Sequence, residues 1–571
     1  MPDVRFWQSY DTDIKNVKWF NAEANNLDIA FLNKHDASVW VEEAQIIQSN
    51  IKDEIIDQAF TRLPAEVQDG ASEDIKRKLK GRLKNLDDIA KRYGDLMQKI
   101  VVIHGTNKDD KIEITRLPQG KTKVVLKRLK TKAPNPIFFE RTFDRNDTEE
   151  LWIYGLNDDD EFVVSGEGDR AIMVRLIGGH GDDVFDISNR KNLKVYDWKH
   201  EKAEFTNKTP RKQFTPLYET NTFIYREFIE NSNVLFPNVG FKSDNGLFVG
   251  LKNTYTNHGF NGEDYRYKHS LSANYFLNFG AVEAEYQGQF ANIIPNWDFE
   301  VIGYFTNSKF VHNFFGYGND TTYDKDEVNK DFNRARTRQF KLRSGIGYRE
   351  LNFHALFENY KVEESPDRLF NSDNMGNDVF ESQNYVGAEA DILYENSDAL
   401  NFPTRGFYFQ ALLGYKRNLK LNPNQFGYAA FKLGFDKKLI PSGDLVLGSK
   451  AELRTNFSDD YLFYHAQSIG GNSGLRGYRN DRFSGKTSFY QSTDLKWRIK
   501  EFITAVSPIT IGVYGGFDYG RVWVSEDRSS TWHNSYGGGF WIGSLKALSL
   551  NAGYFLSDED AIIQVGFGFG F

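Results

Sequence analysis

Several features that other classes of protein need are missing from this chain of 571 residues. It contains no cysteine, which excludes disulfide bonds and thiolate chemistry. No uninterrupted apolar run approaches the roughly 18–20 residues that a transmembrane helix requires, which excludes a bundle of such helices. The first residues, MPDVRFWQSYDTD, lack the basic and apolar regions of a signal peptide. If the protein is exported, we expect this chain to be a mature form or part of a longer precursor.

The usual signatures of enzymes are missing as well. The sequence has no G-x-S-x-G elbow, no P-loop, and none of the D-x-H, G-N-H-[DE] or G-H-x-H motifs with which a metallophosphoesterase holds two metals. Scattered histidines such as His104 and His180 do not supply that pattern. The net charge of −8 argues against nucleic acid as a main partner. We therefore expect this chain to be neither an enzyme nor a nucleic-acid-binding protein.

Aromatic residues, by contrast, are abundant. They make up 15% of the chain, with 48 Phe and 29 Tyr, beside 48 Gly and only 14 Pro. From about Asn233 to the end, apolar and polar residues alternate. In AVEAEYQGQF, for example, Val282 and Phe290 share one face with Tyr286, and four Glu or Gln residues share the other. Membrane β-strands hide their hydrophobicity by such alternation, so their average composition looks polar.

Three features favour a membrane barrel for residues 216–571 over a soluble sandwich. Many strands reach the roughly 9–11 residues that a tilted membrane strand needs, large aromatics recur near strand ends, and short turns alternate with long ones. We predict an antiparallel transmembrane barrel of sixteen strands, an even number that places both chain ends on one side. The predicted strands begin near Val234, Leu247, Tyr267, Ala281, Trp297, Arg336, Leu351, Asn384, Arg405, Phe426, Asp444, Lys486, Thr510, Ser535, Ala547 and Ala561.

Residues 1–100 are predicted to be mainly helical. Isoleucines and Phe60 recur at helical spacing in EEAQIIQSNIKDEIIDQAFTRL, and IKRKLKGRLKNLDDIAKRYGDLMQKI places leucines among lysines and arginines. The basic face of the second run has two interpretations. We favour a solvated face with acidic residues nearby, and the alternative is a contact for an anionic partner or a membrane surface.

Residues 101–215 are predicted to form a small β-rich domain with an internal repeat. The segments IHGTNKDDKIEI, IYGLNDDDEFVV and IGGHGDDVFDI align on Gly105, Gly155 and Gly178. A glycine turn, an acidic corner and a strand make one rung of a coiled β structure. The aspartates that follow the three glycines are Asp109 and Asp110, Asp159 and Asp160, and Asp182 and Asp183.

The third copy, LIGGHGDDVFDIS, resembles a calcium-binding nonapeptide repeat. Oxygen-rich corners suit Ca²⁺, which makes Asp109, Asp159, Asp182 and Asp183 candidate ligands. Such sites need close tandem copies, whereas these lie 50 and 23 residues apart. We therefore favour aspartates that close turns by accepting hydrogen bonds from backbone N–H groups, and we expect no other cofactor.

The stretch GGNSGLRGYRNDRFSG lies between the eleventh and twelfth predicted strands. Its residues Leu475, Arg476, Gly477 and Tyr478 resemble the V-R-G-F/Y signature of the BamA/TpsB superfamily, the bacterial surface antigen family. GFDYGRVW, which contains Asp518, is similar to the F-x-D-x-G stretch of that family's strand thirteen, with its Phe one place closer to the Asp. ENSD through NFPTRG resembles the turn before strand nine.

The resemblance implies a sixteen-stranded barrel in the bacterial outer membrane. It implies that the loop folds back into the lumen and that Arg476 pairs there with Asp518, which suits the bidentate geometry of a guanidinium and a carboxylate. The terminal Phe571 matches the aromatic residue that serves such barrels as a membrane-insertion signal. The expected partners are outer-membrane lipid and, during biogenesis, the barrel assembly machinery.

The region before the barrel resembles a particular subgroup of this superfamily. It lacks the βααβ order of POTRA domains. FERTFDRNDTEELWIYGLNDDDEFVVSGEG and VRLIGGHGDDVFDIS are instead similar to single-chain members, common among Bacteroidetes-type bacteria, that begin with a calcineurin-like metallophosphoesterase domain. This implies a periplasmic N-terminal region and a catalytic domain, if there is one, upstream of residue 1.

These expectations lead to one favoured function. The barrel anchors, displays or translocates the polypeptide attached to its N-terminal side, with the lumen gated by the LRGY loop. The alternative is a general insertase or translocase that acts on separate client proteins. A diffusion porin and a soluble β-rich binding protein are further alternatives from other classes.

Overall fold

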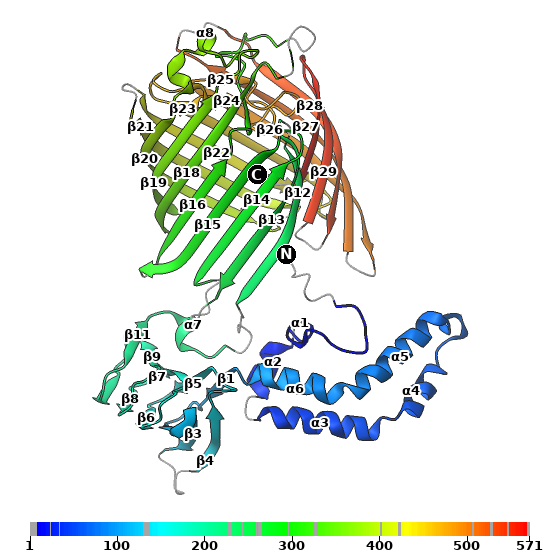
Figure 1. The fold of residues 1–571 in the computed structure, drawn as a ribbon, viewed down its shortest axis with the longest axis vertical. Coiled ribbons are helices and arrows are strands. Elements are labelled where there is room, and N and C mark those ends of the chain that lie inside the picture. The colour runs from blue at the N-terminus through cyan, green and yellow to red at the C-terminus, as the bar shows by residue number, and fades with distance from the viewer. Residues whose placement is uncertain are drawn as a thin grey trace. The chain divides into compact units, whose positions relative to one another are not determined.

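A computed structural model describes residues 8–567, apart from 23, 33–34, 130–135, 225–230, 243, 259, 261–264, 295, 324–328, 330, 400–401, 421–423, 505–507, 526–528 and 545–547. The predicted insertion signal, Phe571, lies outside the described residues. The chain forms two compact units, of which one contains residues 2–230 with 258–264 and the other contains residues 231–257 with 265–571. Figure 1 shows both units, and each is described by itself below.

The first unit begins with the helices expected within residues 1–100. They are α1 (Val17–Phe20), α2 (Asn25–Phe31), α3 (Ala37–Asn50), α4 (Asp53–Phe60), α5 (Gly70–Lys84) and α6 (Leu86–Met97). Helices α3 and α6 pack together through the edge-to-face pair of Trp40 and Tyr93, whose ring centres are 5.0 Å apart. Among the described helices, none is long and apolar enough to cross a membrane.

The basic face of α5 is matched by acidic side chains. Lys80 lies 2.7 Å from Asp57 on α4, and Lys78 lies 2.6 Å from Asp74 on its own helix. Asp69 caps the helix by accepting hydrogen bonds from the first-turn N–H groups. These pairs are the arrangement expected of a solvated face with acidic neighbours.

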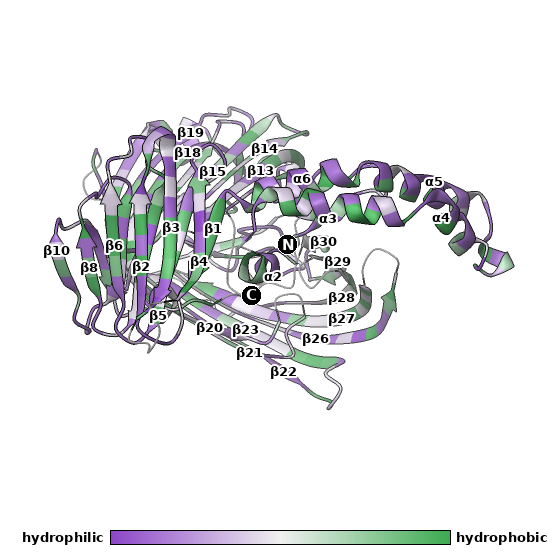
Figure 2. Ribbon diagram, turned by 90° about the horizontal axis from the view of Figure 1, so that it is seen from below, coloured by the Kyte–Doolittle hydropathy of each residue, from purple (hydrophilic) through white to green (hydrophobic). Residues whose placement is uncertain are grey.

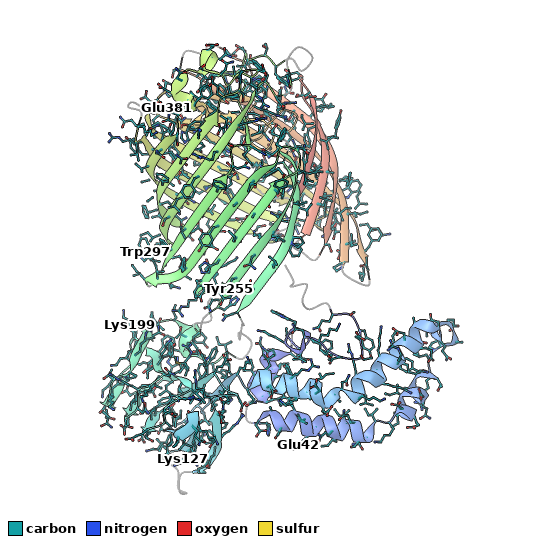
Figure 3. The ribbon with its side chains drawn as sticks, viewed as in Figure 1. Glu42, Lys127, Lys199, Tyr255, Trp297 and Glu381 are labelled. Carbon is teal, nitrogen blue, oxygen red and sulfur yellow. The ribbon has the colours of Figure 1, made fainter. Side chains whose placement is uncertain are left out.

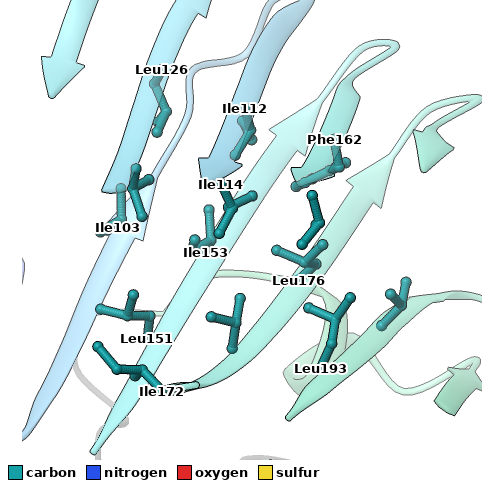
Figure 4. Packing of buried hydrophobic residues seen from close by; sticks show 14 of the residues in the cluster. Ile103, Ile112, Ile114, Leu126, Leu151, Ile153, Phe162, Ile172, Leu176 and Leu193 are labelled. Atoms are coloured by element: carbon teal, nitrogen blue, oxygen red, sulfur yellow. The ribbon is translucent and has the colours of Figure 1, made fainter. Parts of the chain in front are cut away.

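The rest of this unit is a two-layered β domain built from rungs. One sheet is parallel throughout, in the order β1-β5-β7-β9-β11, and the other has the order β10-β8-β6-β2-β3-β4 with β3 and β4 antiparallel. Apolar side chains such as Ile112, Phe162 and Leu176 fill the space between the sheets (Figure 4). Hydrophilic and hydrophobic residues form bands along β2, β3 and β6 (Figure 2). The strands are β1 (Ile100–His104), β2 (Asp110–Arg116), β3 (Lys121–Arg128), β4 (Ile137–Asp144), β5 (Glu150–Asn157), β6 (Glu161–Gly166), β7 (Met173–His180), β8 (Val184–Ile187), β9 (Leu193–Trp198), β10 (Glu204–Asn207) and β11 (Arg211–Thr215).

The repeat aspartates stack in two series along these rungs. In the buried series, Asp160 Oδ1 accepts a hydrogen bond from the Asp110 N–H at 2.8 Å, and Asp183 Oδ1 accepts one from the Asp160 N–H at 2.9 Å. In the exposed series, Asp109 accepts from the Asp159 N–H at 3.2 Å, and Asp159 accepts from the N–H of Asp182 at 2.9 Å. Within the described residues, no group of three or more metal-ligating side chains is found. The aspartates bond to the backbone, and the calcium site stays a prediction.

Glycine is needed in the repeat because it makes room for the buried carboxyl groups. A Cβ atom on Gly155 would lie 2.2 Å from Asp160 Oδ2, and one on Gly178 would lie 2.1 Å from Asp183 Oδ2. Burial, followed by nearby carboxylates, raises the pKa of Asp160 to about 9 and that of Asp183 to about 7. The folded domain therefore favours neutral carboxyl groups at these positions.

The second unit is an antiparallel barrel, as predicted. Sixteen long strands pair in sequence order, and each begins within two residues of its predicted start. The short strand β17 (Val311–Asn313) adds to β18, and no pairing joins β30 to β12 among the described residues. The long strands are β12 (Ser232–Lys242), β13 (Gly246–Asn257), β14 (Tyr267–Phe276), β15 (Ala281–Ile294), β16 (Trp297–Thr306), β18 (Arg334–Tyr348), β19 (Leu351–Glu363), β20 (Gln383–Ser397), β21 (Arg405–Asn418), β22 (Gln425–Lys438), β23 (Leu445–Asn456), β26 (Thr487–Ile503), β27 (Pro508–Trp523), β28 (His533–Ser544), β29 (Leu548–Leu556) and β30 (Ala561–Phe567).

The two faces of the barrel wall have the polarity expected in a membrane. Large apolar side chains such as Leu235 are exposed on the outside, whereas polar side chains such as Glu283 and Asp391 are buried inside. Tyr255 and Trp297, both near strand ends, lie close to the same rim of the barrel (Figure 3). This inversion of polarity distinguishes a transmembrane barrel from a soluble one.

Candidate functional site

The candidate site is the long loop between β23 and β26. It contains a 3₁₀ turn, η5 (Phe463–His465), and the short paired strands β24 (Gln467–Ile469) and β25 (Phe483–Gly485), which Figure 1 places near the upper rim of the barrel. Leu475 and Tyr478 are buried against Tyr490 and Val522 of the barrel wall. Gly474 has a φ of 109°, and a Cβ there would lie 2.3 Å from the Tyr490 ring. The loop therefore folds into the barrel, and its glycine allows close approach to the wall.

Arg476 and Asp518 are brought together at the centre of this loop. The Arg476 Nη2 atom lies 2.7 Å from Asp518 Oδ1, and Nε lies 3.0 Å from Oδ2. The backbone N–H of Arg476 donates to the same carboxylate at 3.0 Å, and the Ser535 hydroxyl donates at 2.8 Å. The Asp518 side chain has no solvent exposure. A buried carboxylate needs such donors, and these fix both the side chain and the backbone of the loop.

A second carboxylate, which the sequence analysis missed, shares the guanidinium. Asp494 on β26 accepts from Arg476 Nη2 at 2.7 Å. The Phe555 ring covers the guanidinium, with its centre 4.1 Å from Cζ. Arg476 and Asp494 also line a cavity of about 260 Å³ together with Lys450. The Lys450 ammonium group is opposite in charge to the Asp494 carboxylate. Arg476 thus connects the loop to β26, β27 and β29.

Two glycines leave the space that this arrangement needs. A Cβ on Gly516 would lie 2.4 Å from both Arg476 Nη2 and Asp494 Oδ1. A Cβ on Gly477 would lie 2.7 Å from the Leu556 carbonyl oxygen and 2.8 Å from the Ser535 Cβ. The G of the LRGY motif is therefore explained by contact with the wall.

The same loop holds the last hairpin of the barrel, formed by β29 and β30. Gln564 on β30 donates to the Arg476 carbonyl oxygen at 3.1 Å, and the Ser557 hydroxyl donates to the Gly477 carbonyl oxygen at 2.9 Å. The Tyr478 hydroxyl donates to Asp558 in the turn of that hairpin. All three contacts are made by backbone or side-chain atoms of the LRGY motif.

Arg482 adds an ion pair to this hairpin that sequence reasoning also missed. Its side chain is 1% exposed, Nε donates to Glu559 at 2.7 Å, and Nη1 donates to the Thr321 hydroxyl at 2.7 Å. Arg482 thus ties the loop to the turn between β29 and β30 and to the loop between β16 and β18.

A further contact holds the start of the loop near η5. His465 Nε2 lies 2.9 Å from Glu358 Oε2 on β19, and Lys416 lies 2.9 Å from the other oxygen of that carboxylate. Tyr464 stacks on Tyr360 with ring centres 4.3 Å apart. The loop is therefore anchored on opposite parts of the wall, at β19 and at β26–β30.

The part of the chain that contains this loop is similar to known proteins. Residues 406–542 match the family model of the haemolysin secretion/activation proteins ShlB/FhaC/HecB. The match supports a BamA/TpsB-type barrel. It runs from β21 into β28 and includes both Arg476 and Asp518. No match was found among curated proteins.

Solved structures of this type are also similar to the chain. BamA from Haemophilus ducreyi lacking POTRA domains 1–3 has 13% identity and a TM-score of 0.43, with 59% of this chain and 70% of that chain covered. CdiB from Escherichia coli has 12% identity and a TM-score of 0.40, with 59% and 61% covered. CdiB from Acinetobacter baumannii has 11% identity and a TM-score of 0.34, with 59% of each chain covered.

The predicted site residues therefore fall into two groups. Leu475, Arg476, Gly477, Tyr478 and Asp518 meet in one place inside the barrel. The repeat aspartates belong to the other compact unit and form their own series there.

Proposed function

We propose that this protein is an outer-membrane barrel of the BamA/TpsB type that anchors, displays or translocates an attached N-terminal domain. The observation that carries the proposal is the pinning of the LRGY loop inside the barrel by Arg476, Asp518 and Asp494. A passive porin needs a lumen open to solutes, whereas this loop fills part of the lumen with buried side chains. The family match over the same residues supports the proposal.

The contacts suggest how the loop acts as a gate. Its backbone carbonyls at Arg476 and Gly477 accept from Gln564 and Ser557, so movement of the loop breaks hydrogen bonds to the last hairpin. Its guanidinium is held by two carboxylates, so movement also leaves the buried Asp518 carboxylate without its cation. These contacts stabilise the closed state cooperatively. Opening requires the loop to separate from the last hairpin and the contacts between them to break together.

The attached domain is the helical and β-rich unit, with any domain that precedes it in a longer precursor. We propose that this unit is periplasmic in a Bacteroidetes-like bacterium, that a metallophosphoesterase-like domain lies upstream, and that Phe571 serves as the membrane-insertion signal. Outer-membrane lipid and the barrel assembly machinery are the proposed partners during biogenesis.

Protease accessibility in cells tests this function. The full chain, with an epitope before residue 1, is produced behind a signal peptide in a Gram-negative host. Display predicts cleavage of the epitope in intact cells, and periplasmic anchoring predicts cleavage only after the outer membrane is permeabilised. Recovery of the chain in the soluble fraction would refute both. Unassembled client barrels that copurify with the chain would instead favour the alternative, an insertase acting on separate proteins.

A further inference from the structure

A groove of about 400 Å³ lies on the β domain, in the compact unit that does not contain the barrel loop. It runs along the edge where three neighbouring parallel strands begin, at Met173 of β7, Leu193 of β9 and Arg211 of β11. Arg190 and Lys194 complete its charged lining. Its volume is within the range of roughly 300–1,000 Å³ found for small-ligand sites.

The groove is strongly basic, in a chain whose net charge is −8. Its lining includes two arginines and one lysine but no carboxylate. Residues 190–212 contain eight Lys or Arg and three Asp or Glu, and one of those acids, Asp197, is buried. This segment is therefore rich in positive charge, and the groove lining itself carries three cations and no carboxylate.

The two arginines of the groove are not used by the fold. Within the described part of the chain, neither Arg190 nor Arg211 makes an ion pair, and both are exposed. Arg175, which lies one strand away, shows the contrast, because Glu150 holds it at 2.8 Å. A structural role accounts for Arg175 but leaves the charges of Arg190 and Arg211 unexplained.

We propose that this groove binds a phosphate-bearing anionic ligand through Arg190 and Arg211, assisted by Lys194. A guanidinium donates two parallel hydrogen bonds to a phosphate, and a phosphate group presents more oxygens and more negative charge to a cluster of cations than a single carboxylate does. Met173, which is half-buried, gives the groove apolar surface for a carbon atom that the phosphate carries, whereas Leu193 and Pro210 of the lining are buried. The phosphate can belong to a phospholipid headgroup or to a soluble compound. The proposal does not depend on the function of the barrel.

Calorimetric titration of the full chain in a neutral detergent tests this site. The probes are inorganic phosphate, short-chain phosphatidylglycerol and, as a zwitterionic control, short-chain phosphatidylcholine. Binding of phosphatidylglycerol that is much tighter than that of phosphate assigns the lipid source, and equal affinities with mutual displacement assign the soluble source. Either result supports the site, provided that added NaCl weakens the binding.

The variants connect binding to the groove. Arg190→Gln with Arg211→Gln should lower the affinity by about tenfold or more, because charge-assisted hydrogen bonds are lost. Replacing both residues by Lys should give an intermediate loss, since charge remains without the fork. Lys202→Gln removes a charge from the same segment outside the groove lining and should change affinity by less than about twofold. Absence of phosphate and phosphatidylglycerol binding, equal loss in the Lys202 variant, or equal binding of an oligoglutamate peptide would overturn the proposal.

Discussion

Removing the guanidinium of Arg476 should destabilise the loop and the barrel together. In Arg476→Ala the buried Asp518 carboxylate keeps the backbone N–H of residue 476 and the Ser535 hydroxyl but loses its cation. Breaking a buried pair from one side typically costs about 3–5 kcal/mol. Because two neutral donors remain, we expect a loss near the lower end, about 3 kcal/mol.

A double-mutant cycle separates the interaction free energy of Arg476 and Asp518 from a general loss of stability. Arg476→Ala, Asp518→Asn and the double variant are unfolded by urea in lipid vesicles, with tryptophan fluorescence as the signal. We expect a coupling free energy of about 2 kcal/mol, within the range for residues in direct contact. Asp494 holds the guanidinium when Asp518 is neutral, so Asp518→Asn should cost less than Arg476→Ala.

Two controls make the result specific. Arg479→Ala removes a second arginine from the same loop and should cost less than Arg476→Ala, because its guanidinium lies over the Tyr323 ring and not beside Asp518. Arg476→Lys keeps the charge without the fork and should fall between Ala and wild type. A coupling free energy near zero, or equal losses for the two alanine variants, would refute the reasoning.

Three further predictions concern other contacts. Asp160→Asn should flatten the pH dependence of the β domain. Folding raises the pKa of Asp160 from 3.8 to about 9, so its contribution to stability is full below pH 3.8 and is lost as pH rises toward 9. The variant should therefore be more stable than the wild-type protein at pH 8. Hydrogen exchange of β5–β8 at pH 5 and pH 8 measures this difference. Gly516→Ala should speed exchange in the loop because the new Cβ meets Arg476, whereas Gly515→Ala, whose nearest neighbour is 3.8 Å away, should not. Arg482→Gln should loosen the β29–β30 hairpin in the same measurement, and unchanged exchange there would contradict the role of its ion pair.

The barrel was predictable because its signals are local. Alternation along each strand and the turn residues between strands locate a start such as Trp297 without knowledge of distant contacts. The partner of Arg476 was reachable only through the family resemblance, since nothing within the loop itself points to Asp518. Predicting Asp494 as the second partner of Arg476 required the pairing register of the strands as well. Asp494 pairs in register with Gly516, two residues along from Asp518 on the same face, and the strand register was not available from the sequence.

The β domain shows a different limit. The repeat pointed to all the Asp pairs, but Asp109 and Asp159 were chosen as candidate ligands beside the third pair. Strand parity places Asp110 on the same face as Ile112 and Ile114, which are buried, so alternation was enough to identify the buried series, but the sequence analysis did not apply it. A carboxyl group in an apolar core is unfavourable unless it is hydrogen-bonded or neutral, and only the stacked backbone N–H groups of neighbouring rungs reveal that bonding.

Ion conductance in a planar bilayer tests the proposal that the loop closes the lumen and that Arg476 holds it there. We expect a small conductance for the wild-type protein and frequent larger openings for Arg476→Ala, with Arg479→Ala close to wild type. A large, steady wild-type conductance that Arg476→Ala leaves unchanged would contradict it and would favour a diffusion porin.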